Sequence, residues 1–166
     1  MIRPTLALLL VIILCPGWLR GEEPPRECRD LIAGFFTSLR ANDATRAVTE
    51  LMADKGKWGV QTEFPKIIGV LQGMNESTVG KLHDHQVVAI GHLGPDYLIM
   101  VVMARYDRQP LFFRFAFYRA QDRFTTDTLN MNSNVGEVFG EWIRPANLTV
   151  TATAAATATE ARSVVP

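Results

Sequence analysis

Apolar and polar residues alternate along the second half of the chain, most clearly between Leu111 and Arg119. Phe113, Phe115 and Phe117 recur at every second position, which is the spacing of one face of a β-strand. Similar patterns predict four strands, at Lys81–Ile90, Tyr97–Tyr106, Leu111–Arg119 and Arg123–Asn132. Short turn sequences separate these segments, so we expect neighbouring strands to be antiparallel.

Apolar residues in the first half recur at spacings of three and four, which is typical of amphipathic helices. The predicted helices are about Arg26–Ala41, Ala44–Ala53 and Thr62–Leu71. Asp43 is suited to cap the second helix, and Pro65 falls in the first turn of the third, where proline is tolerated. This order predicts an α+β fold, with three N-terminal helices packed on a curved antiparallel sheet of four or more strands.

The turns predict which residues face each other across the sheet. A two-residue turn at Gln121–Asp122 fixes the last hairpin. Its expected pairs are Arg119 with Phe124, Phe117 with Thr126, and Ala116 with Asp127. In the preceding hairpin, the expected pairs are Arg105 with Phe112 and Met103 with Arg114.

In this register one face is largely apolar and is expected to lie under the helices. Leu98, Met100 and Val102 belong to it. The part that could line an apolar pocket comprises Phe113, Phe115, Phe117, Phe124, Thr126, Thr128 and Asn130. A slip of one residue would exchange the two faces.

The opposite face also carries large apolar side chains, with charged residues between them. Exposing so many apolar groups to water is unfavourable, so something must cover them. A second copy of the domain would give a homodimer through Ile99, Val101, Met103, Arg105, Phe112, Arg114, Tyr118, Asp127, Leu129 and Met131. A segment of the same chain, such as Val135–Ile143, is an equally good cover. Asp127 and Arg114 are expected to pair as diagonal neighbours.

The length and charge of the chain narrow its class. The 166 residues suit one domain, and 17 basic residues balance 17 acidic ones, so we expect no nucleic-acid partner. Arg3, the apolar run Thr5–Leu14 and the small residues after it indicate a signal peptide over residues 1–21. The run is about half the length that spans a membrane, so we expect export to the periplasm or the outside and no stable membrane span after cleavage. An uncleaved anchor or a lipid attachment is the alternative.

The remaining chain divides at about residue 145. Residues 22–145 are predicted to form a single domain, and the Thr/Ala-rich residues 146–166 a disordered tail. Loss of Cys15 with the signal would leave Cys28 as the only cysteine. Cys28 shares a helical stripe with Ile32 and Phe35, which favours a small buried side chain over a reactive thiol.

Helices with Phe35-Phe36 near the start, followed by long antiparallel strands, give the chain a family resemblance. The aromatic strand ending in Phe117-Tyr118-Arg119, the tight turn after it and Phe124 are similar to exported bacterial members of the nuclear-transport-factor-2-like superfamily, which has a cystatin-like fold. The resemblance implies a cone-shaped sheet with an apolar pocket, often in a dimer. Relatives include ketosteroid isomerases, dehydratases and proteins that only bind.

Isomerase chemistry needs a carboxylate base and hydrogen-bond donors inside an apolar pocket. The face under the helices offers only Thr126, Thr128 and Asn130 as polar groups, which disfavours catalysis. His83 and His85 would point the same way in a strand, but nothing completes a metal site, and we expect no cofactor. The sequence therefore predicts a non-catalytic binding or assembly domain for a small apolar ligand or a peptide, with an isomerase- or dehydratase-type enzyme as the alternative. A third possibility is a purely structural dimer unit, in which the phenylalanines of the sheet fill the cone.

Overall fold

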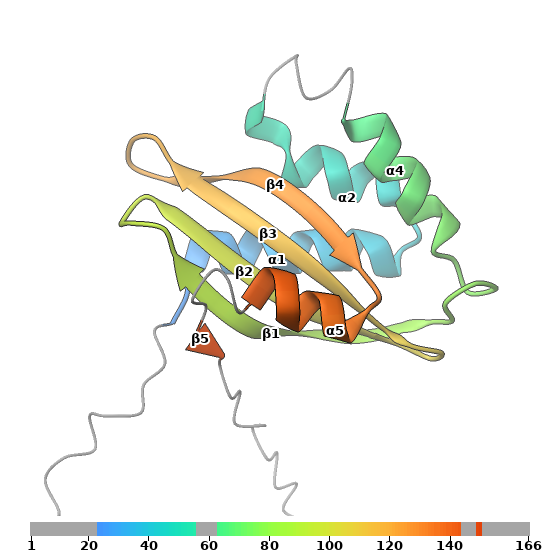
Figure 1. The fold of residues 1–166 in the computed structure, drawn as a ribbon. Helices are drawn as coiled ribbons and strands as arrows, with labels where there is room; N and C mark the ends of the chain where they lie inside the picture. The colour runs from blue at the N-terminus through green and yellow to red at the C-terminus, as the bar shows by residue number, and fades with distance from the viewer. Residues whose placement is uncertain (1–22, 56–62, 144–148, 151–166) are drawn as a thin grey trace, which may run out of the picture.

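A computed structural model describes residues 23–55, 63–143 and 149–150 of the chain (Figure 1). The α+β fold is confirmed, with an antiparallel sheet in the order β4-β3-β2-β1-β5. The described elements are α1 (Arg26–Arg40), α2 (Ala44–Leu51), η1 (Ala53–Lys55), α4 (Phe64–Gly73), β1 (Leu82–His92), β2 (Tyr97–Tyr106), β3 (Pro110–Arg119), β4 (Phe124–Asn132), α5 (Val135–Glu137), η2 (Val138–Ile143) and β5 (Thr149–Val150). The predicted signal peptide lies outside the described residues. So does the predicted tail, apart from Thr149 and Val150 of β5, which pair with β1.

The helix boundaries follow from local sequence. The Asp43 carboxylate accepts a hydrogen bond from the Arg46 backbone N–H at 2.9 Å, so the predicted cap of α2 is confirmed. Asn42 has a φ of 57°, a left-handed conformation that asparagine tolerates, and it turns the chain between α1 and α2. Pro65 lies in the first turn of α4, as predicted.

The last hairpin contains a β-bulge that the sequence did not reveal. The predicted pairs Arg119 with Phe124 and Phe117 with Thr126 are confirmed. The predicted pair of Ala116 with Asp127 is wrong, because Ala116 pairs with Thr128. The additional residue in β4 exchanges the two faces of the strand beyond it. Leu129 and Met131 therefore lie on the side of the helices, and Thr128 and Asn130 lie on the other side.

The preceding hairpin differs from its prediction by two residues. Met103 pairs with Phe112, and Val101 pairs with Arg114, because the turn is longer than expected. Arg105 pairs with Pro110. Side chains alternate with a period of two, so this shift changes the partners without changing the faces.

The sheet is covered on both faces. We call the face under the N-terminal helices the helix-side face and the opposite one the outer face. Figure 1 shows α1 behind the sheet and α5 in front of it. Val138 and Ile143 pack on the outer face against Ala89, Ile99, Val101, Phe112 and Ala116. Of the two covers considered above, the structure shows the segment from the same chain.

Candidate functional site

The aromatic centre of the predicted pocket is filled by side chains. Phe113, Phe115 and Phe117 are completely buried. Phe35 of α1 meets Phe113 and Phe115 edge to face, with ring centroids 5.7 and 5.5 Å apart. Phe36 meets Phe113 in the same way at 5.2 Å. These separations are those of packed aromatic pairs, so this part of the helix-side face is core.

The other predicted pocket residues are divided between the two faces. Phe124 and Thr126 are buried on the helix-side face, and the Thr126 hydroxyl oxygen has no hydrogen-bond partner among the described residues. Thr128 and Asn130 are exposed on the outer face, so their predicted place under the helices is wrong. The bulge before Thr128 is the physical reason.

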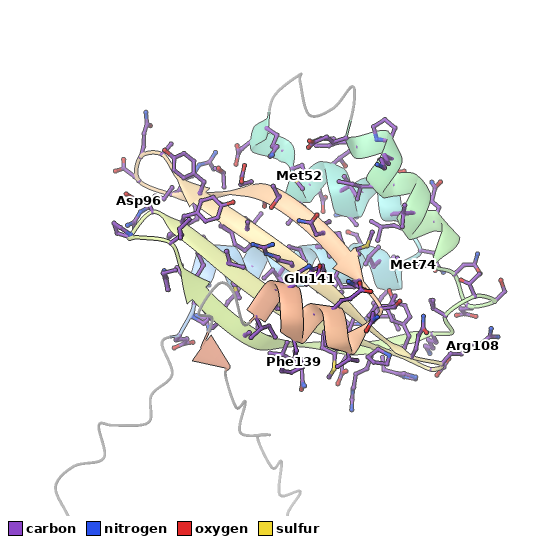
Figure 2. The ribbon with its side chains drawn as sticks, viewed as in Figure 1. Met52, Met74, Asp96, Arg108, Phe139 and Glu141 are labelled. Atoms are coloured by element: carbon purple, nitrogen blue, oxygen red, sulfur yellow. The ribbon has the colours of Figure 1, made fainter. Side chains whose placement is uncertain are left out.

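Open space lies at one end of the layer formed by the helices α1, α2 and α4, which we call the helix layer. A cavity of about 480 Å³ is bounded by the end of α1, the start of α2, the end of α4 and the connection into β1. Met74, labelled in Figure 2, marks this end of the molecule. The lining residues are Leu39, Arg40, Asn42, Ala44, Leu71, Gln72, Met74, Asn75, Glu76, Ser77, Gly80, Lys81, Leu82 and Tyr106. None of the seven predicted pocket residues is among them.

The lining of this cavity is apolar in its buried part and charged in its exposed part. Leu71 and Leu82 are buried members of the helix-side core. Arg40 and Lys81 are exposed. Tyr106 is partly buried, and burial raises its pKa above the usual value for a phenol. The cavity therefore resembles small-molecule sites, in which an apolar surface is combined with a few polar groups.

Hydrogen bonds shape the wall of the cavity between α4 and β1. The Asn75 side-chain oxygen accepts from the Ser77 backbone N–H at 2.9 Å, and the Thr78 hydroxyl donates to the Gly73 carbonyl at 2.7 Å. Gly80 has a φ of 86°, and a Cβ placed there would lie 2.5 Å from the Cβ of Asp107. Only glycine fits this position, so the wall has a defined conformation.

Asp107 holds the end of this wall against the sheet. Its carboxylate accepts a hydrogen bond from the Lys81 backbone N–H at 2.6 Å and lies 2.5 Å from the Nε2 atom of His83. The Lys81 N–H and the His83 contact lower the pKa of Asp107. The carboxylate therefore remains charged at neutral pH and fixes the chain at the entrance to β1.

No family model, curated protein or solved structure matches the chain. Within the described ranges, no helix is both long and apolar enough to cross a membrane. The site must therefore be interpreted from its own residues.

A second polar group lies at the bulge in β4. The Tyr97 hydroxyl donates to an Asp127 carboxylate oxygen at 2.7 Å, and the Lys55 ammonium lies 3.5 Å from the other oxygen. Burial and Asp127 raise the pKa of Tyr97. The predicted pair of Asp127 with Arg114 is wrong, since Asp127 bonds to these two groups and the Arg114 Nε is buried without a hydrogen bond.

The residues proposed for a dimer face have different environments. Ile99, Val101 and Phe112 are buried beneath the C-terminal segment. Arg105 forms a bidentate ion pair with Asp84. The Tyr118 side chain is half exposed. Met103 packs against the outer cluster, and Leu129 and Met131 belong to the helix-side face instead. Leu129 and Met131 were therefore assigned to the wrong face.

His85 and Cys28 are both packed against other side chains of the fold. The His85 ring stacks on Phe36 with centroids 4.2 Å apart, and its Nδ1 lies 3.4 Å from the Arg40 guanidinium. Among the described residues, no cluster of three or more possible ligands could hold a metal ion. Cys28 is completely buried, and burial raises its pKa to about 12. The predicted burial of Cys28 is confirmed.

Proposed function

We propose that this chain is an exported, non-catalytic binding domain whose ligand occupies the cavity at the end of the helix layer. The observation that carries the proposal is the cavity itself. Its volume of about 480 Å³ falls within the range of roughly 300–1,000 Å³ that is usual for small-molecule sites. Its buried lining supplies apolar contact, and its exposed residues supply polar contact.

The wider architecture supports this choice of site. In the cone of a nuclear-transport-factor-2-like domain, a curved sheet and its helices enclose a ligand. In this chain the phenylalanines of α1 and β3 fill the middle of that layer, so the ligand space is displaced to one end. The N-terminal charge and short apolar run support export to the periplasm or the outside.

A small isomerase- or dehydratase-type enzyme is the second candidate. The hydrogen bond between Tyr97 and Asp127 favours it, because a phenol and a carboxylate in contact can move a proton. Neither residue lines the cavity, however. The one carboxylate that does, Glu76, makes no hydrogen bond or ion pair with a described residue that would orient it. Binding without catalysis is therefore the better supported function.

A homodimer through the outer face has less support than ligand binding. The apolar side chains that motivated it, such as Val101 and Phe112, are already buried by the C-terminal segment. A partner would have to displace Val138 and Ile143 before it could contact them. The proposed binding domain therefore needs no second copy.

Filling the cavity tests the proposal. Ala44 is a small buried residue in the cavity lining, and Ala44→Leu would occupy part of the space. Ala53→Leu is the matched control, because Ala53 is exposed and does not line the cavity. A fragment library is screened by ligand-observed NMR against the wild type and both variants. We expect binders that Ala44→Leu loses and Ala53→Leu keeps, with cooperative melting of both variants. A wild type without binders, or binders insensitive to Ala44→Leu, would overturn the proposed site.

A further inference from the structure

We propose that the ligand of this cavity is an amphipathic carboxylate, with an apolar chain in the buried part and its anionic head at Arg40 and Lys81. This inference rests on the proposed function and specifies the class of ligand. It follows from the charges in the lining, the unused donor beside them and the apolar residues below.

The charges in the lining favour an anion. Arg40 and Lys81 contribute two cations, and Glu76 contributes one carboxylate. In the described part of the chain, neither cation has a carboxylate within ion-pair distance. The one hydrogen-bond contact of the Arg40 side chain with a described residue is to the ring nitrogen Nδ1 of His85, at 3.4 Å. Both cations therefore retain donors that can bind an anionic group.

Other cations near this end of the molecule are already engaged. The Arg108 guanidinium donates to the backbone carbonyls of Ser77 and Thr78, so it holds the cavity wall. Arg46 at the start of α2 pairs with Glu50 at 2.8 Å. The contrast with these engaged residues identifies Arg40 and Lys81 as the groups available to a ligand.

Tyr106 adds a neutral donor to the lining. It is partly buried, and its hydroxyl makes no hydrogen bond to a described residue. The hydroxyl oxygen is not among the buried polar atoms that lack a partner, so it is accessible to solvent and to a ligand. A carboxylate oxygen would satisfy this donor together with the two cations, which a neutral or cationic head could not do as well.

The apolar part of the ligand follows from the buried lining. Ala44, Leu71 and Leu82 are buried, and Leu39 and Met74 are partly exposed beside them. A small polar anion would leave this surface in contact with water, whereas an alkyl chain would cover it. Burial of apolar area is favourable, so the alkyl chain of the ligand supplies affinity and its head supplies selectivity.

Titration calorimetry with decanoate and decanol tests the inference, because these probes share a chain and differ in the charge of the head. We expect decanoate to bind the wild type about tenfold more tightly than decanol, as suits a hydrogen bond to a charged group. The double variant Arg40→Met and Lys81→Met should bind the two probes equally. Lys66→Met is the matched control, because Lys66 is exposed and lies outside the cavity lining. Lys81→Arg keeps the charge and should retain the preference for decanoate.

The outcomes separate this inference from the proposed function. Equal affinity for decanoate and decanol in the wild type would overturn the anionic head and leave a binding cavity. An unchanged preference for decanoate in the double variant would show that other residues bind the head, and would also overturn the inference. If fragments bind at the cavity but decanoate does not, the ligand class is wrong and the proposed function stands. If neither fragments nor decanoate bind, both are wrong.

Discussion

The two faces of the sheet are covered in different ways. On the helix-side face, Phe35 and Phe36 of α1 lie among the phenylalanines of β3, and the rings pack edge to face. On the outer face, a short C-terminal segment contributes Val138 and Ile143. The two covers lie on opposite sides of the same strands, as Figure 1 shows.

This difference indicates which face of the sheet contributes more to the stability of the fold. The helix-side cluster contains more buried residues and most of the aromatic rings, so it provides the larger share of apolar burial. The outer cluster is smaller, and polar groups such as Tyr97 and Arg114 lie beside it. Phe139 and Glu141, which are labelled in Figure 2, are exposed residues of its cover. We therefore expect larger effects from changes on the helix-side face.

The largest effect is expected at the centre of the helix-side face. Phe115→Ala removes a completely buried ring that contacts Phe35 and should lower the free energy of unfolding by about 3–5 kcal/mol. Phe112→Ala is the counterpart on the outer face, and we expect a smaller loss because its cover is thinner. Urea denaturation of both variants measures the difference. If Phe112→Ala were the more damaging, the assignment of stability to the helix side would be wrong.

The next effect is expected in the cover of the outer face. Ile143 is buried against the sheet, so Ile143→Ala should lower the free energy of unfolding by about 2–4 kcal/mol. Phe139 belongs to the same segment but is 48% exposed, so Phe139→Ala should change stability by less than about 0.5 kcal/mol. Equal effects in thermal or urea melts would show that the segment does not hold the sheet through Ile143.

A smaller effect is expected at the polar edge of the outer face. Tyr97→Phe removes the hydroxyl that donates to Asp127 and should lower the free energy of unfolding by about 1 kcal/mol. Tyr118→Phe is the control. Tyr118 lies next to Tyr97 on the adjacent strand, its side chain is half exposed, and its hydroxyl has no hydrogen-bond partner among the described residues. A double-mutant cycle of Tyr97→Phe with Asp127→Ala, which removes the acceptor, measures the coupling. A coupling near zero would contradict a stabilising role for this bond.

The sequence predicted the elements well because their patterns are local. The predicted strand Tyr97–Tyr106 has the observed bounds, and Asp43 caps α2 as expected. The alternating phenylalanines of β3 were correctly placed under the helices. Hydrophobic periodicity determines these features, since one face of each element must be buried.

The errors concern features that no local pattern encodes. The bulge in β4 adds one residue without a glycine or proline to mark it, so Thr128 and Leu129 were assigned to the wrong faces. The cavity residues were missed because they come from helix ends and a connection that meet only in the folded chain. Asp43, the predicted cap of the second helix, lies between the lining residues Asn42 and Ala44, and this was the one available signal. The space that α1 fills with Phe35 and Phe36 depends on packing across elements.

The smallest effect is expected where the helix layer meets β1, at His85. Burial and the neighbouring Arg40 cation lower the pKa of His85 below its usual value of 6.5, although the Asp84 carboxylate acts in the opposite direction. Between the unfolded and folded pKa values, the unfolded chain binds more protons, so stability falls as the pH falls below about 6.5. The lowered pKa values of Asp84 and Asp107 act near and below 3.8, outside this window.

Replacing the imidazole by a ring that does not titrate isolates the contribution of His85 to the pH dependence of stability. His85→Phe keeps an aromatic ring against Phe36, whose centroid lies 4.2 Å away, and removes the proton-binding site. Melting temperatures at about pH 7.5 and about pH 5.5 are compared for the wild type and the variant. We expect the wild type to lose stability on acidification and the variant to lose less. Parallel profiles would show that His85 does not carry the acid sensitivity. A wild type that gains stability on acidification would mean that its folded pKa is raised instead of lowered.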